Sequence, residues 1–365
     1  IYNGNYGIDE ESGLGIGDQT PEKFRPLLTY IDNNNRAVDT MFDGFPFLGL
    51  TSQYRNDFYS PDSYAHAGAK DWIWYLDKTF KEGGDMDALE EAARIASEEL
   101  NDPNYQVKAV VMFPNTNPLK GDNFGALDER GNLDMNNEED WKYATDWWTN
   151  EVVTRFEAKN YKYVKLSGIY WLNEQADYVQ RIKYWEEGVH ALGLKTYWIP
   201  YFHSSGYLWP QDLGFDATAY QMNHFFDSAY EPGGAGELGN KVMANHAARM
   251  NYAGTGAEFE LDGRVYEEVG KYNQFIDYLN AAVDYGYDGP GYYRNWYFGR
   301  PITELAASGS SIIRSIYDNI YQVMKGTYER REYLDADDFP RNPDIGGFYS
   351  HGVDGEGLPN NGGSI

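Results

Sequence analysis

The chain of 365 residues contains no cysteine. Disulfide bonds and metal sites built on thiolates are therefore excluded. Long apolar runs are missing too: no segment approaches 18 consecutive apolar residues, so we expect no membrane-spanning helix. The lack of cysteine is compatible with the cytosol and with proteins that anaerobic bacteria secrete, and it does not choose between these compartments.

Positive charge is scarce. Lys and Arg together number 30, against 57 Asp and Glu, which gives a formal net charge of −27. Nucleic acids and anionic membranes are bound by neutralising their phosphates with Lys and Arg. We therefore expect no nucleic-acid partner, and a neutral or cationic ligand is easier to accommodate. The oligomeric state is left open.

Motifs for nucleotides, serine catalysis and metals are absent as well. No Gly-x-Gly-x-x-Gly follows a strand to open a helix, no Gly-x-Ser-x-Gly occurs, and the six histidines form neither His-x-His nor His-Glu-x-x-His. The acidic stretches 134–140 and 335–338 match no EF-hand loop and are interpreted as solvated surface. We expect no cofactor and no bound metal, and a metal-dependent hydrolase remains only as an alternative.

Aromatic residues are abundant, at 17% of the chain with 33 Tyr and 10 Trp. One interpretation is a core and surface rich in tyrosine. The other is a carbohydrate cleft, in which flat rings stack on sugar faces and their polar tips bind hydroxyl groups.

Apolar segments alternate with segments of helical periodicity along most of the chain, which predicts a parallel α/β sheet. We count eight strands and expect a single (β/α)8 TIM barrel over residues 1–340. Long loops are expected at 5–35 and 115–137, and a loop or disordered tail at 341–365. The expected strands are 1–3, 41–50, 107–113, 163–172, 195–201, 215–220, 255–261 and 287–293.

Helix signals lie between these strands. Asn137 is expected to cap the helix 138–159, Asp85 to cap a helix at 86–100, and Pro46 to mark a bulge in its strand. A short helix is expected at 207–213. The remaining helices are expected at 64–80, 177–192, 236–252, 265–283 and 302–325.

Two glutamates stand near the end of the seventh expected strand. Side chains alternate along a strand, so Glu258 and Glu260 share one face and Phe259 faces the other way. Two carboxylates together in an interior are costly unless donors or cations hold them, and proteins keep such pairs mainly for function. In the alternative interpretation both point outward and pair with Lys or Arg of the helices.

The fourth expected strand ends in Asn173 and Glu174. Cleavage of a glycosidic bond needs one carboxyl group that protonates the leaving oxygen and a second, ionised carboxylate. Glu174 fits the acid role, because Trp171 and Leu172 give it an apolar setting that favours the protonated form. Alternatively, Glu174 is a carboxylate that favours the start of the following helix through the helix dipole.

Barrel enzymes collect their site residues at the carboxyl ends of the strands. The candidate catalytic residues are Glu174, Glu260 and Glu258. The candidate substrate-binding residues are Trp171, Asn173, Trp198, Tyr201, His203, Tyr220, Gln221, Asn223, Asp262, Tyr292 and Arg294.

The Asn-Glu pair on strand four and the glutamates on strand seven resemble the pattern of clan A glycoside hydrolases. That resemblance implies a retaining enzyme with Glu174 as acid/base, Asn173 as its sugar-binding neighbour, and Glu260 or Glu258 as nucleophile. Strand seven carries Glu-x-Glu-x-Asp instead of a single closing Glu, so both nucleophile assignments stay open.

Longer segments resemble a bacterial family known only as a domain of unknown function, common in secreted proteins of the Bacteroides and Paenibacillus type. The resemblance covers about 41–293 and rests on the segments 168–174, 198–201, 213–216 and 258–262. It implies a barrel with a role in glycan processing.

Two functions are therefore expected. The first is a secreted glycoside hydrolase that acts on a polysaccharide or oligosaccharide. The alternative is a non-catalytic carbohydrate-binding barrel of a cell-surface glycan-utilisation system. The chain starts at Ile1 without Met, so we expect a secreted, periplasmic or cell-surface protein whose signal peptide is not part of this sequence.

Overall fold

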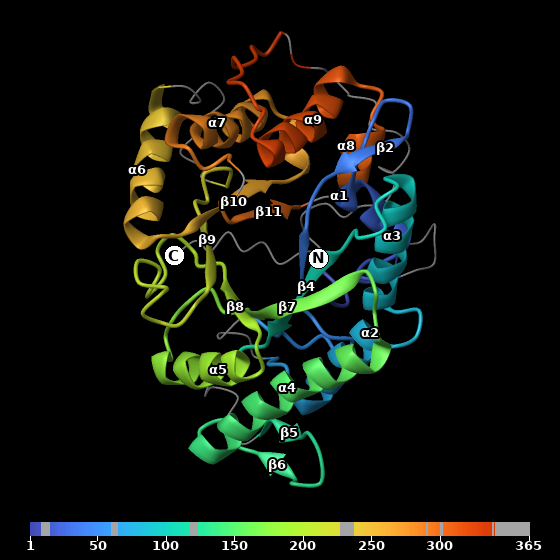
Figure 1. Ribbon diagram of the computed structural model, residues 1–365. Coiled ribbons are helices and arrows are strands. Elements are labelled where there is room, and N and C mark those ends of the chain that lie inside the picture. Colours follow the sequence, from blue (N-terminus) through green and yellow to red (C-terminus); the bar gives the residue numbers. More distant parts are fainter. Residues whose placement is uncertain are drawn as a thin grey trace. The chain divides into compact units, whose positions relative to one another are not determined.

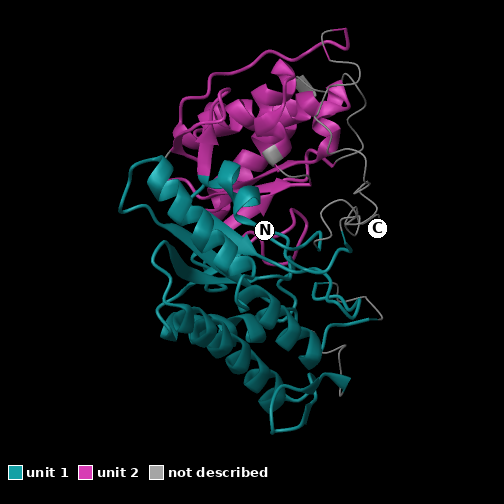
Figure 2. Cartoon of the chain, turned by 90° about the vertical axis from the view of Figure 1, so that its right-hand side faces the viewer, with its two compact units in different colours: residues 1–28, 42–198, 211–217 teal, residues 29–41, 199–210, 218–365 magenta. Residues whose placement is uncertain are grey.

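The computed structural model describes residues 1–8, 15–59, 65–116, 123–226, 237–289, 291–299, 302–337 and 339. The expected tail at 341–365 lies outside this part. The chain divides into two compact units, which Figure 2 colours separately. Unit 1 comprises Ile1–Leu28, Phe42–Trp198 and Gln211–Ala217, and unit 2 comprises Thr29–Met41, Ile199–Pro210 and Thr218–Ile365. The single domain over 1–340 stays a prediction.

The fold is mixed α/β, as the sequence predicts. Its main sheet has seven strands in the hydrogen-bonded order β11-β10-β9-β8-β7-β4-β3 (Figure 1). Neighbouring strands pair in parallel among β3, β4, β7 and β8 in unit 1, and among β9, β10 and β11 in unit 2. A closed eight-stranded barrel is not confirmed, because β11 and β3 end this order in the described part of the chain. The strands are β3 (Gly44–Phe47), β4 (Val107–Phe113), β7 (Val164–Trp171), β8 (Lys195–Trp198), β9 (Ala217–Gln221), β10 (Gly256–Leu261) and β11 (Arg294–Phe298).

The first expected strand is reduced to a single bridge. Tyr2 forms a parallel bridge with Leu48, just after β3. The backbone N–H of Asn3 donates to the carbonyl of Leu48, and the N–H of Leu48 donates to the carbonyl of Ile1, both at 2.9 Å. The amino-terminal segment thus lies beside β3 without forming a strand of its own.

The last expected strand, 287–293, is wrong. Its place is taken by β11, which begins at Arg294. Gly286 and Gly291 have φ angles of 73° and 92°, and such left-handed backbone ends a helix or makes a turn but does not continue a strand. Residues expected at the carboxyl end of this strand therefore lie at or before its start.

Helices flank the strands of unit 1. In Figure 1, α4 and α5 run beside β7 and β8. The expected helix 138–159 and strand 107–113 are confirmed to the residue. The helices of unit 1 are α1 (Pro21–Leu28), α2 (Ala69–Phe80), α3 (Asp85–Glu99), α4 (Glu138–Lys159) and α5 (Val179–Ala191), and β5 (Gly125–Ala126) pairs antiparallel with β6 (Asn132–Leu133).

Asn137 caps α4 as expected. Its side-chain oxygen accepts hydrogen bonds from the backbone N–H groups of Glu139 and Asp140, at 2.9 and 3.3 Å. These groups have no partner within the helix, so the cap satisfies donors that would otherwise depend on water.

Asn137→Ala is expected to lower the free energy of unfolding by about 1 kcal/mol, because it removes both cap hydrogen bonds. Chemical denaturation followed by circular dichroism measures the change. Asn136→Ala is the matched control, since Asn136 is exposed, precedes the cap, and donates from its side-chain amide to Asp134 at 3.2 Å. Equal effects of the two changes would contradict the assignment.

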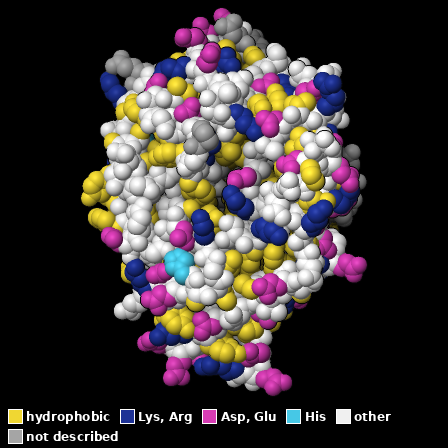
Figure 3. All heavy atoms as spheres, in the orientation of Figure 1, with side chains coloured by type: hydrophobic (Ala, Val, Ile, Leu, Met, Phe, Trp, Pro, Cys, Tyr) yellow, Lys and Arg dark blue, Asp and Glu magenta, His cyan; other side chains and the backbone are white. Residues whose placement is uncertain are grey.

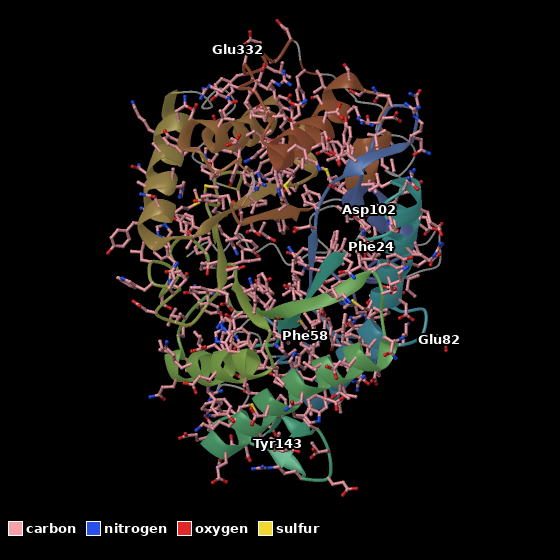
Figure 4. The ribbon with its side chains drawn as sticks, viewed as in Figure 1. Phe24, Phe58, Glu82, Asp102, Tyr143 and Glu332 are labelled. Carbon is pink, nitrogen blue, oxygen red and sulfur yellow. The ribbon has the colours of Figure 1, made fainter. Side chains whose placement is uncertain are left out.

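Unit 1 has an aromatic core. Trp148 of α4 is fully buried, lies 5.1 Å from Trp72 and 5.8 Å from Tyr75 between ring centroids, and donates its indole N–H to the carbonyl of Met112 at 2.9 Å. Figure 4 labels two further buried rings, Phe24 and Phe58. Many aromatic residues of unit 1 therefore pack in its core. This agrees with the interpretation of the aromatic content as a core and surface rich in tyrosine.

Unit 2 carries its helices beside β10 and β11, with α7 and α9 drawn next to these strands in Figure 1. An antiparallel hairpin packs on α9, where Tyr30 stacks on Tyr321 at 3.9 Å. The elements of unit 2 besides its strands in the main sheet are β1 (Thr29–Ile31), β2 (Ala37–Thr40), α6 (Glu237–Ala253), the 3-10 helix η2 (Gly263–Tyr266), α7 (Val269–Tyr285), α8 (Ile302–Ala307) and α9 (Ser311–Lys325).

Three local expectations are wrong. Asp85 does not cap α3, because Gly84 is the cap and the buried Asp85 carboxylate accepts hydrogen bonds from Lys78 at 2.7 Å and Asn3 at 3.1 Å. Pro46 marks no bulge, because β3 pairs with β4 in unbroken register, and β3 ends the strand order, where proline is tolerated. Residues 207–213 form turns, not a helix.

The described surface carries many acidic side chains. In the view of Figure 3, Asp and Glu are spread over the face, with Lys and Arg between them. Many of these cations are paired, such as Arg94, which contacts both Glu91 and Glu98 at 2.7 and 2.6 Å. Among the described helices, none has the length and apolar character needed to cross a bilayer.

Candidate active site

The two glutamates of β10 are buried in unit 2. Glu258 and Glu260 expose 5% and 3% of their surface. Of the main-sheet strands described in this unit, β10 lies between β9 and β11. Its register places Glu258 between Gln221 of β9 and Asn295 of β11. All six residues of β10 are buried, Phe259 included, and alternation along the strand puts Glu258 and Glu260 on one face. Which face that is stays a prediction.

Each carboxylate accepts hydrogen bonds from neutral groups. The side-chain amide of Asn295 donates to Oε1 of Glu258 at 2.5 Å. Oε2 of Glu260 accepts from the backbone N–H of Asn223 at 2.7 Å and from the hydroxyl of Tyr278. Burial and the neighbouring charge of Glu260 raise the pKa of Tyr278 well above its ordinary value. The hydroxyl therefore keeps its proton and stays a donor to Glu260.

The backbone turn after β9 supplies one of these donors. Asn223 has a φ of 55°, in the left-handed region that Asn tolerates better than most residues. This conformation turns the chain as it leaves β9 and directs the N–H of Asn223 at Glu260. Asn223, a predicted substrate-binding residue, thus acts on Glu260 through its backbone.

A buried histidine follows in the same segment and pairs with an aspartate of α7. Nε2 of His224 lies 2.9 Å from Oδ2 of Asp277 on α7, and both side chains are fully buried. Oδ1 of Asp277 accepts a hydrogen bond from the hydroxyl of Tyr333 at 2.6 Å. The pair lies one residue beyond the turn that contacts Glu260 and joins β9 to α7.

The opposite face of β9 carries Tyr220. Its hydroxyl lies 3.2 Å from Nδ1 of His246 and accepts from Arg249 at 3.3 Å, and its ring stacks on Tyr207 at 5.5 Å. Burial raises the pKa of Tyr220 to about 12. Because neighbouring residues of a strand face opposite sides, Tyr220 packs toward α6, away from the side of Gln221 and Glu258.

His246 makes stability depend on pH. Burial, with the charge of Arg249 as a smaller cause, lowers its pKa from 6.5 to about 3. Between pH 6.5 and about pH 3, His246 is protonated in the unfolded chain but not in the folded protein. The free energy of unfolding therefore falls as the pH falls through this range. We expect the free energy of unfolding to drop less from pH 7 to pH 4 in His246→Gln than in the wild type. Identical drops, measured by urea denaturation, would contradict this.

Four predicted site residues lie in unit 1. Asn173 is buried, its Oδ1 accepts from the N–H of Gln175 at 3.0 Å, and its carbonyl accepts from the indole of Trp198 at 2.8 Å. Trp171 stacks on Phe113, and Trp198 stacks on Phe215, at 5.4 and 4.7 Å.

Both tryptophans are almost fully buried, so protein rings cover the faces that a sugar would need. Glu174 is half-buried and lies three residues beyond the end of β7. Its predicted pairing with the glutamates of unit 2 stays a prediction.

Three predicted binding residues have structural contacts. Arg294 begins β11 and donates to the carbonyls of Asp288 and Val323, the latter at 2.7 Å at the end of α9. The hydroxyl of Tyr292 donates to the carbonyl of Thr255, before the start of β10. Their expected place at a carboxyl strand end was wrong because β11 begins later than predicted. Asp262 does follow the end of β10, but it caps η2 and pairs with Arg264 at 2.8 Å.

Three more predicted residues lie near the end of β9. Gln221 is half-buried and donates to the carbonyl of Ile199 at 3.1 Å, and Tyr201 forms a parallel bridge with it. His203 is exposed, with its ring 3.8 Å from that of Phe202. Gln221 and Tyr201 thus belong to the surroundings of Glu258, while His203 lies farther along the loop.

Sequence reasoning missed Asn295, Asp277 and Tyr278 as residues of this site. Asn295 was missed because β11 was placed too early. Asp277 and Tyr278 lie inside a helix, where neither residue type carries a local signal of function.

In the described ranges, no group of three or more His, Asp or Glu side chains is arranged to hold a metal ion. The backbone N–H of Asn223, the side-chain amide of Asn295 and the hydroxyl of Tyr278 are neutral donors among the groups that contact Glu258 and Glu260.

The chain belongs to a protein family described as a domain of unknown function, DUF4855, whose profile matches residues 5–322. The expected membership of an uncharacterised family is confirmed, over a longer span than the sequence segments indicated. A search of curated proteins gave no match. The link to clan A glycoside hydrolases and the bacterial origin stay predictions.

Proposed function

We propose that this protein hydrolyses glycosidic bonds of a polysaccharide or oligosaccharide and retains the anomeric configuration. The observation that carries the proposal is the pair Glu258 and Glu260, buried on β10 and held by amide and hydroxyl donors. Buried carboxylate pairs are concentrated at functional sites. Carboxylates near the carboxyl end of parallel strands are placed as α/β enzymes place their catalytic groups.

Glu260 is our choice for the nucleophile. Two donors fix its Oε2, and a carboxylate held in one orientation needs little reorganisation to attack. Its oxygen forms an ester with the anomeric carbon while the bond to the glycosidic oxygen breaks, and that oxygen takes a proton from the acid. A water then gives a proton back to the acid residue and hydrolyses the ester. Glu258 remains the alternative nucleophile.

The acid role is assigned to Glu174, as the sequence predicts. Glu174→Gln tests this assignment separately from the choice of nucleophile, because glutamine has the same shape as glutamate but supplies no proton. We expect release of reducing ends from a polysaccharide panel by the wild type and a loss of about a hundredfold or more in the variant. A folded Glu174→Gln protein with wild-type activity would remove Glu174 from the mechanism.

The finer expectations about the protein form part of the same proposal. They are a closed (β/α)8 barrel related to clan A glycoside hydrolases, a bacterial source, and a secreted, periplasmic or cell-surface location. An extracellular polysaccharide is too large to cross a membrane, so an enzyme that cleaves one meets it outside the cell.

A non-catalytic glycan-binding protein is the second candidate. It is favoured by Trp209, which exposes 54% of its surface in the loop after β8, because an exposed indole offers a flat face to a sugar. This function predicts saturable oligosaccharide binding without product, weakened about tenfold by Trp209→Ala. Isothermal titration separates it from the first proposal when no reducing ends are released.

A further inference from the structure

We propose that one face of α7 positions the Asn223 turn, so that Gln274 and Lys271 are positioning residues for the carboxylate of Glu260. Residues 271, 274, 277 and 278 are spaced by three, three and one positions, which puts them on one helix face. All four contact the segment 223–225 that follows β9. We call Lys271, Gln274, Asp277 and Tyr278 the α7 clamp.

Each residue of the α7 clamp bonds the segment in a different way. Nζ of Lys271 donates to the carbonyl of Phe225 at 2.6 Å, and Nε2 of Gln274 donates to the carbonyl of His224 at 2.9 Å. Asp277 holds the ring of His224 at 2.9 Å. Together these contacts fix the backbone on the carboxyl side of the Asn223 turn.

The fourth residue connects the α7 clamp to the carboxylate. The hydroxyl of Tyr278 accepts the N–H of Phe225 at 3.3 Å and donates its own proton to Oε2 of Glu260. The same oxygen accepts the N–H of Asn223 at 2.7 Å. Both donors to Glu260 are therefore set by the α7 clamp, one directly and one through the backbone that it holds.

Burial makes these contacts effective. Gln274, Asp277, Tyr278 and His224 each expose 1% or less of their surface. Water cannot replace a lost hydrogen bond there without opening the structure, so removal of a clamp donor loosens the segment that it holds. The Asn223 turn is the part that responds, because its left-handed backbone has to be held in place.

The catalytic part of this inference rests on the proposed function, whereas the structural part does not. Gln274→Met removes the donor and keeps a similar volume. Asn273→Leu is the matched control. Asn273 is the neighbouring buried amide of α7, but its side chain donates to the carbonyl of Leu334 and accepts from the N–H of Leu334, both at 2.9 Å. Lys271→Met is a second clamp variant in case Gln274→Met does not fold.

The first readout is the rate of amide hydrogen exchange, measured by NMR. We expect the amide of Asn223 to exchange about tenfold faster in a clamp variant, the effect of one lost hydrogen bond. Asn273→Leu should leave it unchanged relative to amides of β4, which report global opening. An Asn223 amide with wild-type exchange in both clamp variants overturns the proposal.

Steady-state kinetics on a glycan that the wild type cleaves is the second readout. A clamp variant is expected to lower kcat about tenfold with KM unchanged, while Asn273→Leu keeps both. Faster exchange with unchanged kcat overturns the positioning role and leaves the proposed function standing. If the wild type cleaves nothing, the proposed function fails, and the exchange result alone decides whether α7 holds the turn.

Discussion

Glu260→Ala is expected to lose at least about a thousandfold of the glycan-cleaving activity, because no side chain remains to form the covalent intermediate. Added azide should restore part of the activity. The anion fits the space that the carboxylate leaves, attacks the anomeric carbon from the same side, and yields a glycosyl azide. Chromatography and mass spectrometry identify that product.

The same experiment decides between the two glutamates. Glu258→Ala should lose activity without azide rescue, because its carboxylate is held by Asn295 and is assigned no bond to the sugar. Glu268→Ala, at an exposed glutamate just before α7, is the control and should behave as the wild type. If azide rescues Glu258→Ala alone, Glu258 is the nucleophile in place of Glu260. If azide rescues neither variant, the retaining mechanism is contradicted.

Trp148→Ala is expected to lower the free energy of unfolding by about 3–5 kcal/mol, the range for truncation of a buried Trp. The change leaves a cavity between Trp72 and Tyr75 and deprives the carbonyl of Met112 of its donor. Urea denaturation followed by far-ultraviolet circular dichroism measures the loss.

Trp147→Ala is the matched control, because Trp147 is the adjacent residue of α4 and is only half-buried. It should cost about 1 kcal/mol, since exposed parts of a side chain contribute little. Equal losses in the two variants would show that the aromatic core of unit 1 does not depend on Trp148.

Elements with strong local signals could be predicted from the sequence. The strand 107–113 is a dense apolar run closed by Pro114, and the helix 138–159 has both a cap at Asn137 and a regular apolar spacing. The common face of Glu258 and Glu260 also follows from a local rule, because side chains two positions apart in a strand lie on the same side whatever the neighbouring strands are.

Features that depend on distant partners could not be predicted. The strand expected at 287–293 is wrong, because Gly286 and Gly291 take left-handed backbone and the pairing with β10 begins at Arg294. The donors to Glu260 come from a turn 37 residues before it and from a helix residue 18 positions after it. No local pattern marks Tyr278 or Asn223 as their source.

Burial also changes how the predicted residues are understood. Trp171 and Trp198 were selected because they end strands, yet their rings lie in the core beside Phe113 and Phe215. Trp209, in a turn where a helix was expected, is the exposed indole that remains for a ligand. Residue type and position at a strand end did not distinguish a packing ring from a binding ring.

Covalent labelling tests the central claim most directly. The wild-type protein is incubated with a panel of 2-deoxy-2-fluoroglycosyl fluorides, which form long-lived esters with retaining nucleophiles, and is then digested for peptide mass spectrometry. We predict the mass of one fluorosugar on the peptide that contains Glu258 and Glu260, and no such label in Glu260→Gln. A label on a peptide outside β10, or turnover of these sugars with no labelled intermediate, would contradict the account.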